Sequence, residues 1–297
     1  MKKYLSLSVT IIGLLILTAA FVNKPLQKLS VPPTDSKLCH SIDDPIMAFA
    51  SFANNKEFRD AHALPRPFKP RAKQLKGKMV DFKTPGAEKG HAYLVKAPKK
   101  SNQYLFMFHE WWGLNEYVKD EAAFWAEQLG DVNVLAIDLY DGKVATTRED
   151  AGKLMQGVDS DRAEDIIKGA ISYAGQGAKL ASIGWCFGGG WSLQSAIIAR
   201  HSMEACVMYY GMPIQDEELL ETKLETNVLG IFAKQDRWIT PEVVKEFEEN
   251  MKKAGKELTV AMYDADHAFA NPSSPKYDEE AAKDAREKVR RYLELVF

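Results

Sequence analysis

The sequence places a cysteine at a turn where a catalytic nucleophile could lie. Residues 184–189 read Gly-Trp-Cys-Phe-Gly-Gly, between an apolar run at 178–183 and a helical pattern at 191–199. A strand, a glycine-bounded turn and a helix form a nucleophile elbow, with cysteine here in the place that serine usually holds. Small residues relieve the crowding of such a strained turn, and the helix N-terminus favours a thiolate. Cys186 is therefore a candidate nucleophile; the alternative is a buried structural cysteine.

Two later residues have the types and positions of a base and its orienting acid. Asp236 directly follows an apolar run at 228–233, and His267 follows another at 258–263. If both runs are strands of one parallel sheet, the two side chains meet the nucleophile beyond the strand ends. The order of nucleophile, acid and histidine favours a catalytic triad. The alternatives for the acid role are Asp264 and Asp266.

A loop after an earlier apolar run could complete the site. Residues 109–113 read His-Glu-Trp-Trp-Gly and follow the run at 104–108. In an elbow-containing fold this loop supplies one oxyanion-hole amide, and the residue after the nucleophile supplies the other. We therefore expect the N–H groups of Trp111 and Phe187 to form the oxyanion hole. Glu110 would be costly to bury without a partner, which favours a functional role over that of a partly exposed loop acid.

The elements that must position these residues alternate between strands and helices. This alternation predicts a largely parallel, doubly wound sheet with its site beyond the carboxyl ends of the strands. The first two expected strands form a pair at the sheet edge, joined by a Pro-Gly turn. Strands are expected at 79–83, 91–96, 104–108, 132–137, 178–183, 205–210, 228–233 and 258–263, and helices at 117–129, 148–156, 161–174, 191–199, 241–253 and 279–295.

The composition suits one globular domain. The chain has 297 residues, of which 46% are apolar, and a formal net charge of −2. That length and apolar content support a domain of roughly 200–250 residues. The near-neutral charge gives no reason to expect a nucleic-acid partner.

The N-terminal region differs from the rest. Two lysines precede an uncharged, mostly apolar stretch at 4–22, which predicts a secretory signal at 1–22 with cleavage after Ala20. We expect export, to a bacterial periplasm, or membrane anchoring if the signal stays uncut. Residues 23–76 are rich in proline and are expected to form an extended arm that wraps the 77–297 domain, with one short helix at 45–58.

The cysteine count adds one constraint. Cys39, Cys186 and Cys206 cannot all pair, so an exported protein would carry a free thiol. Cys206 lies in an apolar run and is expected to pack as a small hydrophobic residue. No CxxC motif and no His/Cys cluster is visible in the sequence, so neither a metal nor a cofactor is expected.

Together these motifs resemble the dienelactone hydrolase family of α/β-hydrolases, over roughly residues 75–297. The motifs are His109-Glu110, Asp138-Leu139-Tyr140, the 184–189 elbow, Asp236 and His267-Ala268-Phe269. The resemblance implies an α/β-hydrolase fold, with an N-terminal arm here, and a thiol hydrolase of esters or lactones. It assigns Cys186 as nucleophile, His267 as base, Asp236 as orienter and Glu110 as partner of the resting cysteine.

The resemblance also shows two departures. Arg148 matches a family arginine that binds the substrate carboxylate, but the second such arginine is Asn271 here, and a family tyrosine is Gly152. A carboxylate normally benefits from paired cationic contacts. The resemblance therefore predicts the type of reaction but not the identity of the substrate.

Two other functions use the same residues. A non-catalytic exported protein could bind a small molecule in a pocket lined by Trp111, Trp112 and Trp238, and a thiol redox sensor would need only an activated cysteine. An intact triad favours the hydrolase. Loss of ester turnover on thiol alkylation would separate it from the binding protein, and reversible oxidation of Cys186 without esterase activity would indicate the redox sensor.

Overall fold

The computed structural model describes residues 45–62, 64, 65, 67 and 77–297. The predicted signal at 1–22, the residues up to 44 and Cys39 lie outside the described residues, so export stays a prediction. In the described part of the chain, no helix is long and apolar enough to cross a membrane.

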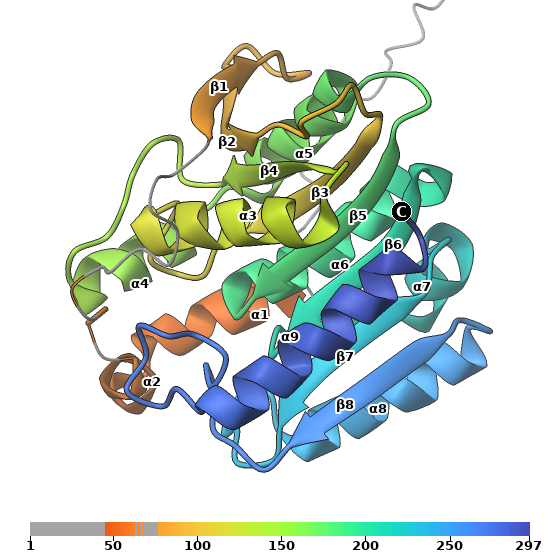
Figure 1. Ribbon diagram of the computed structural model, residues 1–297. Helices are drawn as coiled ribbons and strands as arrows, with labels where there is room; N and C mark the ends of the chain where they lie inside the picture. The colour runs from red at the N-terminus through yellow and green to blue at the C-terminus, as the bar shows by residue number, and fades with distance from the viewer. Residues whose placement is uncertain (1–44, 63, 66, 68–76) are drawn as a thin grey trace, which may run out of the picture. The chain divides into compact units, whose positions relative to one another are not determined.

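The centre of the fold is an eight-stranded mixed sheet with the order β1-β2-β4-β3-β5-β6-β7-β8 (Figure 1). The first two pairings, β1 with β2 and β2 with β4, are antiparallel, and all the others are parallel. The strands are β1 (Lys78–Phe82), β2 (Gly90–Val95), β3 (Gln103–Phe108), β4 (Asn133–Asp138), β5 (Lys179–Trp185), β6 (Met203–Tyr209), β7 (Val228–Ala233) and β8 (Leu258–Tyr263). This confirms the predicted doubly wound, mostly parallel sheet.

The central strands are apolar because helices cover both faces of the sheet. Every residue of β4 and of β7 is buried. Strands buried on both sides read as continuous apolar runs rather than as alternating patterns. That is why these strands could be located from the sequence.

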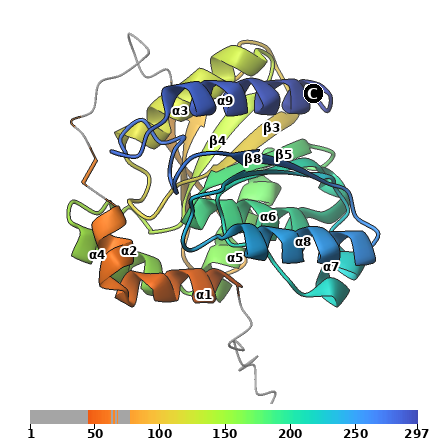
Figure 2. The same ribbon diagram turned by 90° about the horizontal axis from the view of Figure 1, so that it is seen from below.

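The helices form a layer on each face of the sheet (Figure 2). Helices α3 and α9 cover one face, and α5, α6, α7 and α8 cover the other. The helices are α1 (Pro45–Ser51), α2 (Lys56–Ala61), α3 (Glu116–Leu129), α4 (Arg148–Gln156), α5 (Ser160–Ala174), α6 (Phe187–Ala199), α7 (Glu217–Lys223), α8 (Pro241–Lys253) and α9 (Glu279–Glu294), with short 3₁₀ turns at Phe52–Asn54 and Arg200–Ser202.

Three elements differ from the sequence expectations. The single helix expected at 45–58 is two helices, because the Asn55 side chain accepts a hydrogen bond from the Glu57 amide and caps a new helix there. Helix α7 was not expected. Of the two expected edge strands only β1 is at the edge, because β2 also pairs with β4.

The described part of the arm packs on the domain. Helix α1 contacts α6 and α4, and α2 contacts α4. Phe49 and Phe58 are both fully buried, and their rings meet edge to face with centroids 5.7 Å apart. Burial of two aromatic rings supplies the driving force for docking a segment that could not fold alone.

Candidate active site

Cys186 lies on a strained turn between β5 and α6. Its φ is +55° and its ψ is −121°, a conformation that L-residues rarely adopt. Its amide donates to the Tyr209 carbonyl at 3.0 Å, and its carbonyl accepts from the Gly189 amide at 2.9 Å. Because Cys186 is also the N-cap of α6, the positive end of the helix dipole lies at the sulfur.

The two glycines of the elbow are required by close backbone contacts. A Cβ at Gly184 would lie 1.9 Å from the Gly188 carbonyl oxygen, and a Cβ at Gly188 would lie 2.3 Å from the Phe108 carbonyl oxygen. No flexible side chain can move aside at either place, because the blocking atoms belong to the backbone. The spacing of glycines around Cys186 is therefore a packing requirement of the turn.

His267 and Asp236 form a buried, hydrogen-bonded pair beside the cysteine. Asp236 Oδ2 lies 2.6 Å from His267 Nδ1. The other carboxylate oxygen accepts from the Trp238 and Ile239 amides at 2.9 and 3.0 Å, which fixes the orientation of the acid. These contacts leave Nε2 as the nitrogen of His267 that is free to exchange a proton with the sulfur.

The two alternative acids lie elsewhere. Asp264 accepts a hydrogen bond from Gln235, while Asp266 accepts from the His267 backbone amide and pairs with Lys276. Neither carboxylate bonds the His267 ring. Of the three carboxylates, Asp236 is the one that bonds the His267 ring.

Burial and the neighbouring charges set the protonation of the pair. Burial raises the pKa of the Cys186 thiol, although the contacts with His267 and with the Phe187 amide oppose this rise. Burial alone would lower the pKa of His267, but Asp236 and Cys186 raise it well above its ordinary value. Burial therefore favours the thiol form of the sulfur, and the raised pKa makes His267 a stronger base than an ordinary histidine.

Glu110 lies in the same site but does not bond the cysteine. Its carboxylate accepts from the Tyr210 hydroxyl at 3.3 Å and from the Asn271 side-chain amide. Burial raises its pKa to about 6, and His267, Asn271 and Tyr210 limit that rise. The described residues show no hydrogen bond from Glu110 to Cys186, so its role as partner of the resting cysteine stays a prediction.

The loop of Glu110 is fixed by the histidine before it. His109 Nε2 accepts from the Leu139 amide at 3.1 Å, so its Nδ1 carries the proton and donates to the Glu110 carbonyl at 2.7 Å. Of the two amides expected in the oxyanion hole, that of Phe187 hydrogen bonds toward the Cys186 sulfur. The second amide, Trp111 N–H, stays a prediction.

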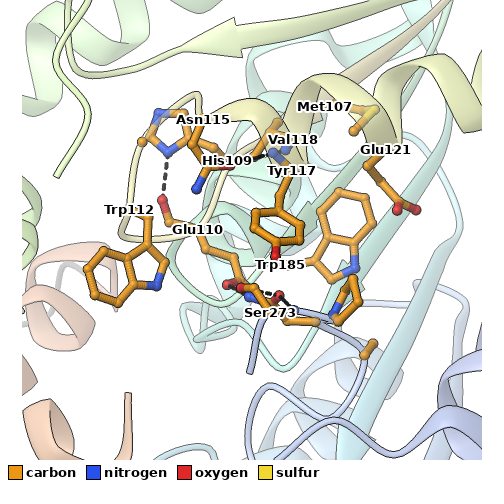
Figure 3. Close-up of a pocket in the computed structure, with 14 residues that line it drawn as sticks. Met107, His109, Glu110, Trp112, Asn115, Tyr117, Val118, Glu121, Trp185 and Ser273 are labelled. Atoms are coloured by element: carbon orange, nitrogen blue, oxygen red, sulfur yellow. Dashed lines mark hydrogen bonds between the residues drawn. The ribbon is translucent and has the colours of Figure 1, made fainter. Parts of the chain in front are cut away.

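Two cavities flank the Glu110 side chain. The larger one lies toward α3, and Figure 3 shows Trp112, Tyr117 and Trp185 around the glutamate there. The other is lined by His267 and by Ala61 and His62 of the arm. The residues common to both cavities are Glu110, Trp112, Asn271 and Ser273.

The four residues expected to bind substrate do not all line the cavities. Trp112 lines both cavities, and Trp238 lines the one that contains His267. Asn271 also lines both, but its side-chain amide is bound to Glu110. Arg148 lines neither cavity, because its guanidinium pairs with Asp60 of α2 at 3.2 Å.

Two residues of the site were not expected from the sequence. Tyr210 directly follows β6, so the strand-end rule that located Asp236 and His267 could have located it as well. His62 follows α2, and its ring centroid lies 5.2 Å from that of His267. Nothing in the proline-rich arm marked His62, because its place depends on how the arm docks. Burial, followed by the charge of His267, lowers the pKa of His62 to about 3, so His62 is neutral.

Known proteins share this architecture. A sequence profile of the Dienelactone hydrolase family matches residues 91–297. Protein usf of Aquifex pyrophilus is 29% identical over 222 residues, which cover 70% of this chain and 94% of that protein. Carboxymethylenebutenolidase 1 of Cupriavidus pinatubonensis is 25% identical over 218 residues, which cover 69% of this chain and 91% of that protein.

A solved structure shares the fold. A dienelactone hydrolase-like promiscuous phosphotriesterase from metagenomic libraries is 22% identical, with a TM-score of 0.66 and coverage of 74% of this chain and 98% of that one. The sheet, its helices and this likeness define an α/β-hydrolase fold. The chain belongs to the dienelactone hydrolase family. It is a hydrolase that acts on ester or lactone bonds.

Proposed function

We propose that this hydrolase cleaves its ester or lactone through a thioester on Cys186. The observation that carries the proposal is the strained elbow, which holds the sulfur beside a histidine that is itself bound to Asp236 at 2.6 Å. A nucleophile, a base and an orienting acid in that relation are the parts of a catalytic triad.

The reaction follows from the order of these contacts. The Cys186 thiol passes its proton to His267 Nε2, and the sulfur forms a bond to the substrate carbonyl carbon. The Phe187 amide, with that of Trp111, stabilises the oxyanion of the tetrahedral intermediate. The carbon–oxygen bond then breaks, and His267 gives its proton to the leaving alkoxide. Water, activated by the same histidine, hydrolyses the thioester to the free acid and restores the thiol.

Glu110 is a second acceptor for the thiol proton during substrate binding. Its pKa of about 6 lets it exchange a proton near neutral pH, and its negative charge helps to raise the pKa of the Cys186 thiol. In the resting site Tyr210 and Asn271 hold the carboxylate away from the sulfur. A bound substrate that competes for the Asn271 amide would free Glu110 to approach.

The substrate group that enters these cavities is uncharged. Among the described residues that line them, Lys276 is the only lysine or arginine, and it is paired with Asp266. Arg148 is paired with Asp60, and Asn271 stands where the resemblance expects a second arginine. The aromatic walls of the larger cavity suit a neutral, partly apolar acyl or alcohol group.

The test is hydrolysis of neutral p-nitrophenyl esters and a small lactone panel by the full chain and by Cys186→Ala. We expect turnover in the wild type and a loss of at least about 10³-fold in the variant, as for removal of a nucleophile in other triads. The matched control is Cys206→Ala, which removes the other described free thiol far from the base. Full turnover by Cys186→Ala would exclude the mechanism, whereas reversible oxidation of Cys186 without turnover would favour the redox sensor.

A further inference from the structure

Among the described residues, three side chains that are far apart in the sequence bring potential metal-binding atoms close together in the fold. One ring nitrogen of His62, one of His267 and the sulfur of Cys186 all lie within 4.8 Å of one another. All three residues are at least nine-tenths buried. The sequence showed no cluster, because His62 comes from the arm and reaches the other two only when α2 docks.

The outer contacts of both histidines match those of metal ligands. His62 Nδ1 bonds to the Phe58 carbonyl at 2.6 Å, and His267 Nδ1 bonds to Asp236 at 2.6 Å. Histidines that bind a metal usually donate their second ring N–H to a carbonyl or a carboxylate in this way. With Nδ1 of each ring engaged in this way, the other ring nitrogen, Nε2, is buried and is the one left to bind a metal.

The surroundings favour a cation. The carboxylate of Asp236 lies behind His267, and Glu110 lines the same cavity as the two histidines. A thiolate with two imidazoles is a donor set that suits zinc, whose catalytic sites use three protein ligands and one water. Tetrahedral zinc with bonds of about 2.0–2.3 Å separates its ligand atoms by about 3.3–3.6 Å. From separations of at most 4.8 Å, the three atoms need to approach one another by no more than roughly an ångström.

We propose that His62, Cys186 and His267 form a site for one Zn²⁺ that reversibly inhibits the hydrolase. On binding, the thiol releases its proton to solvent, a sulfur–zinc bond forms, and no electron is transferred. Water occupies the fourth position. The inhibition rests on the proposed function, because the metal occupies both the nucleophile and the base; the binding site itself does not.

The binding test uses Zn²⁺ and Co²⁺ with the metal-free full chain. We expect one Zn²⁺ per chain by calorimetry, and a thiolate-to-cobalt charge-transfer absorption when Co²⁺ replaces it. The band reports sulfur coordination whether or not any ester is turned over. It therefore separates failure of the metal site from failure of the proposed function. A spectrum without the band would overturn the proposal.

The variant His62→Phe isolates the new ligand. It keeps an aromatic ring among Phe58 and Trp111 but removes the nitrogen, and thermal unfolding shows whether the arm stays docked. Loss of one ligand should weaken Zn²⁺ binding by at least about tenfold, since loss of an outer partner alone costs 10–100-fold. His201→Phe at an exposed position and Cys39→Ser should retain wild-type affinity.

The inhibition test compares ester turnover with and without Zn²⁺. Wild-type turnover should fall as one Zn²⁺ binds and return on adding a chelator, and the same Zn²⁺ concentration should inhibit His62→Phe less. Equal Zn²⁺ affinity in wild type and His62→Phe would overturn the site. Faster turnover with Zn²⁺ would overturn its inhibitory role.

Discussion

Arg148 pairs with Asp60, a carboxylate of the arm, at 3.2 Å. The resemblance assigns this arginine to a substrate carboxylate, whereas in this chain its guanidinium pairs with an internal acid. Asn271, at the second arginine position, holds Glu110 instead. Both family contacts for an anionic substrate are therefore used within the protein.

Release of Arg148 should change substrate preference. In Asp60→Asn the guanidinium loses its carboxylate partner and can attract an anionic substrate. We expect kcat/KM for an ester carrying a carboxylate to rise by up to about fivefold relative to its neutral analogue, the range of an exposed ion pair. Glu57→Gln, an acid on the same helix, is the control. An unchanged ratio in Asp60→Asn would mean that Arg148 does not reach the substrate.

The stability of the protein should depend on pH through Glu110. Its pKa of about 6 exceeds the ordinary 4.5, so the folded state binds the proton more tightly than the unfolded state does. The carboxyl therefore lowers the free energy of unfolding as pH rises from 4.5 to 6, and this penalty is complete above that window.

Glu110→Gln should remove that dependence. The glutamine oxygen can accept from Asn271 and its N–H can donate to the Tyr210 hydroxyl oxygen, but the amide cannot ionise, so we expect the variant to be more stable than wild type at pH 7 by about 1–2 kcal/mol. The difference should disappear near pH 4.5. Denaturant unfolding across this range measures it, and a difference that does not vary with pH would contradict the account.

The elbow should tolerate no side chain at Gly188. Because a Cβ there meets the Phe108 carbonyl oxygen at 2.3 Å, Gly188→Ala should destabilise the fold by about 3 kcal/mol or more. Gly190→Ala is the control in the same helix, since its Cβ would lie 3.3 Å from the nearest atom. Equal stability of the two variants in denaturant would show that the turn can relax.

Removal of the Phe58 ring should release the arm. The ring is fully buried, with centroids 5.6 Å from Trp111 and 5.1 Å from Trp238. Phe58→Ala should cost about 3–5 kcal/mol of docking, with faster proteolysis within 45–62 and faster alkylation of Cys186. Leu64→Ala, at a half-exposed position, should change neither. Unchanged protection of Cys186 in Phe58→Ala would show that the arm does not cover the site.

The sequence predicted best what depends on local pattern. The buried strands were recognisable as apolar runs. Cys186, Asp236 and His267 each lie just after such a run, so the parallel sheet brings them together at the carboxyl ends of its strands. Helix α7 was missed because it is short and its first turn is acidic rather than amphipathic. The other two differences, the division of the expected 45–58 helix at Asn55 and the pairing of β2 with β4, were also missed.

Side-chain partners could not be predicted in the same way. The Glu110 contacts with Asn271 and Tyr210 join three loops, and the ion pair of Arg148 depends on a helix of the arm. His62 reaches the site only through the packing of Phe49 and Phe58. No periodicity or motif encodes such long-range docking.

The most direct test of the central mechanism is to trap the acyl group on the enzyme. The full chain is mixed with excess p-nitrophenyl ester, quenched in acid within one turnover and analysed by intact mass and peptide mapping. The account predicts a mass increase equal to the acyl group on the peptide that contains Cys186, absent from Cys186→Ala. An acyl group on another residue, or turnover that persists in Cys186→Ala, would contradict it.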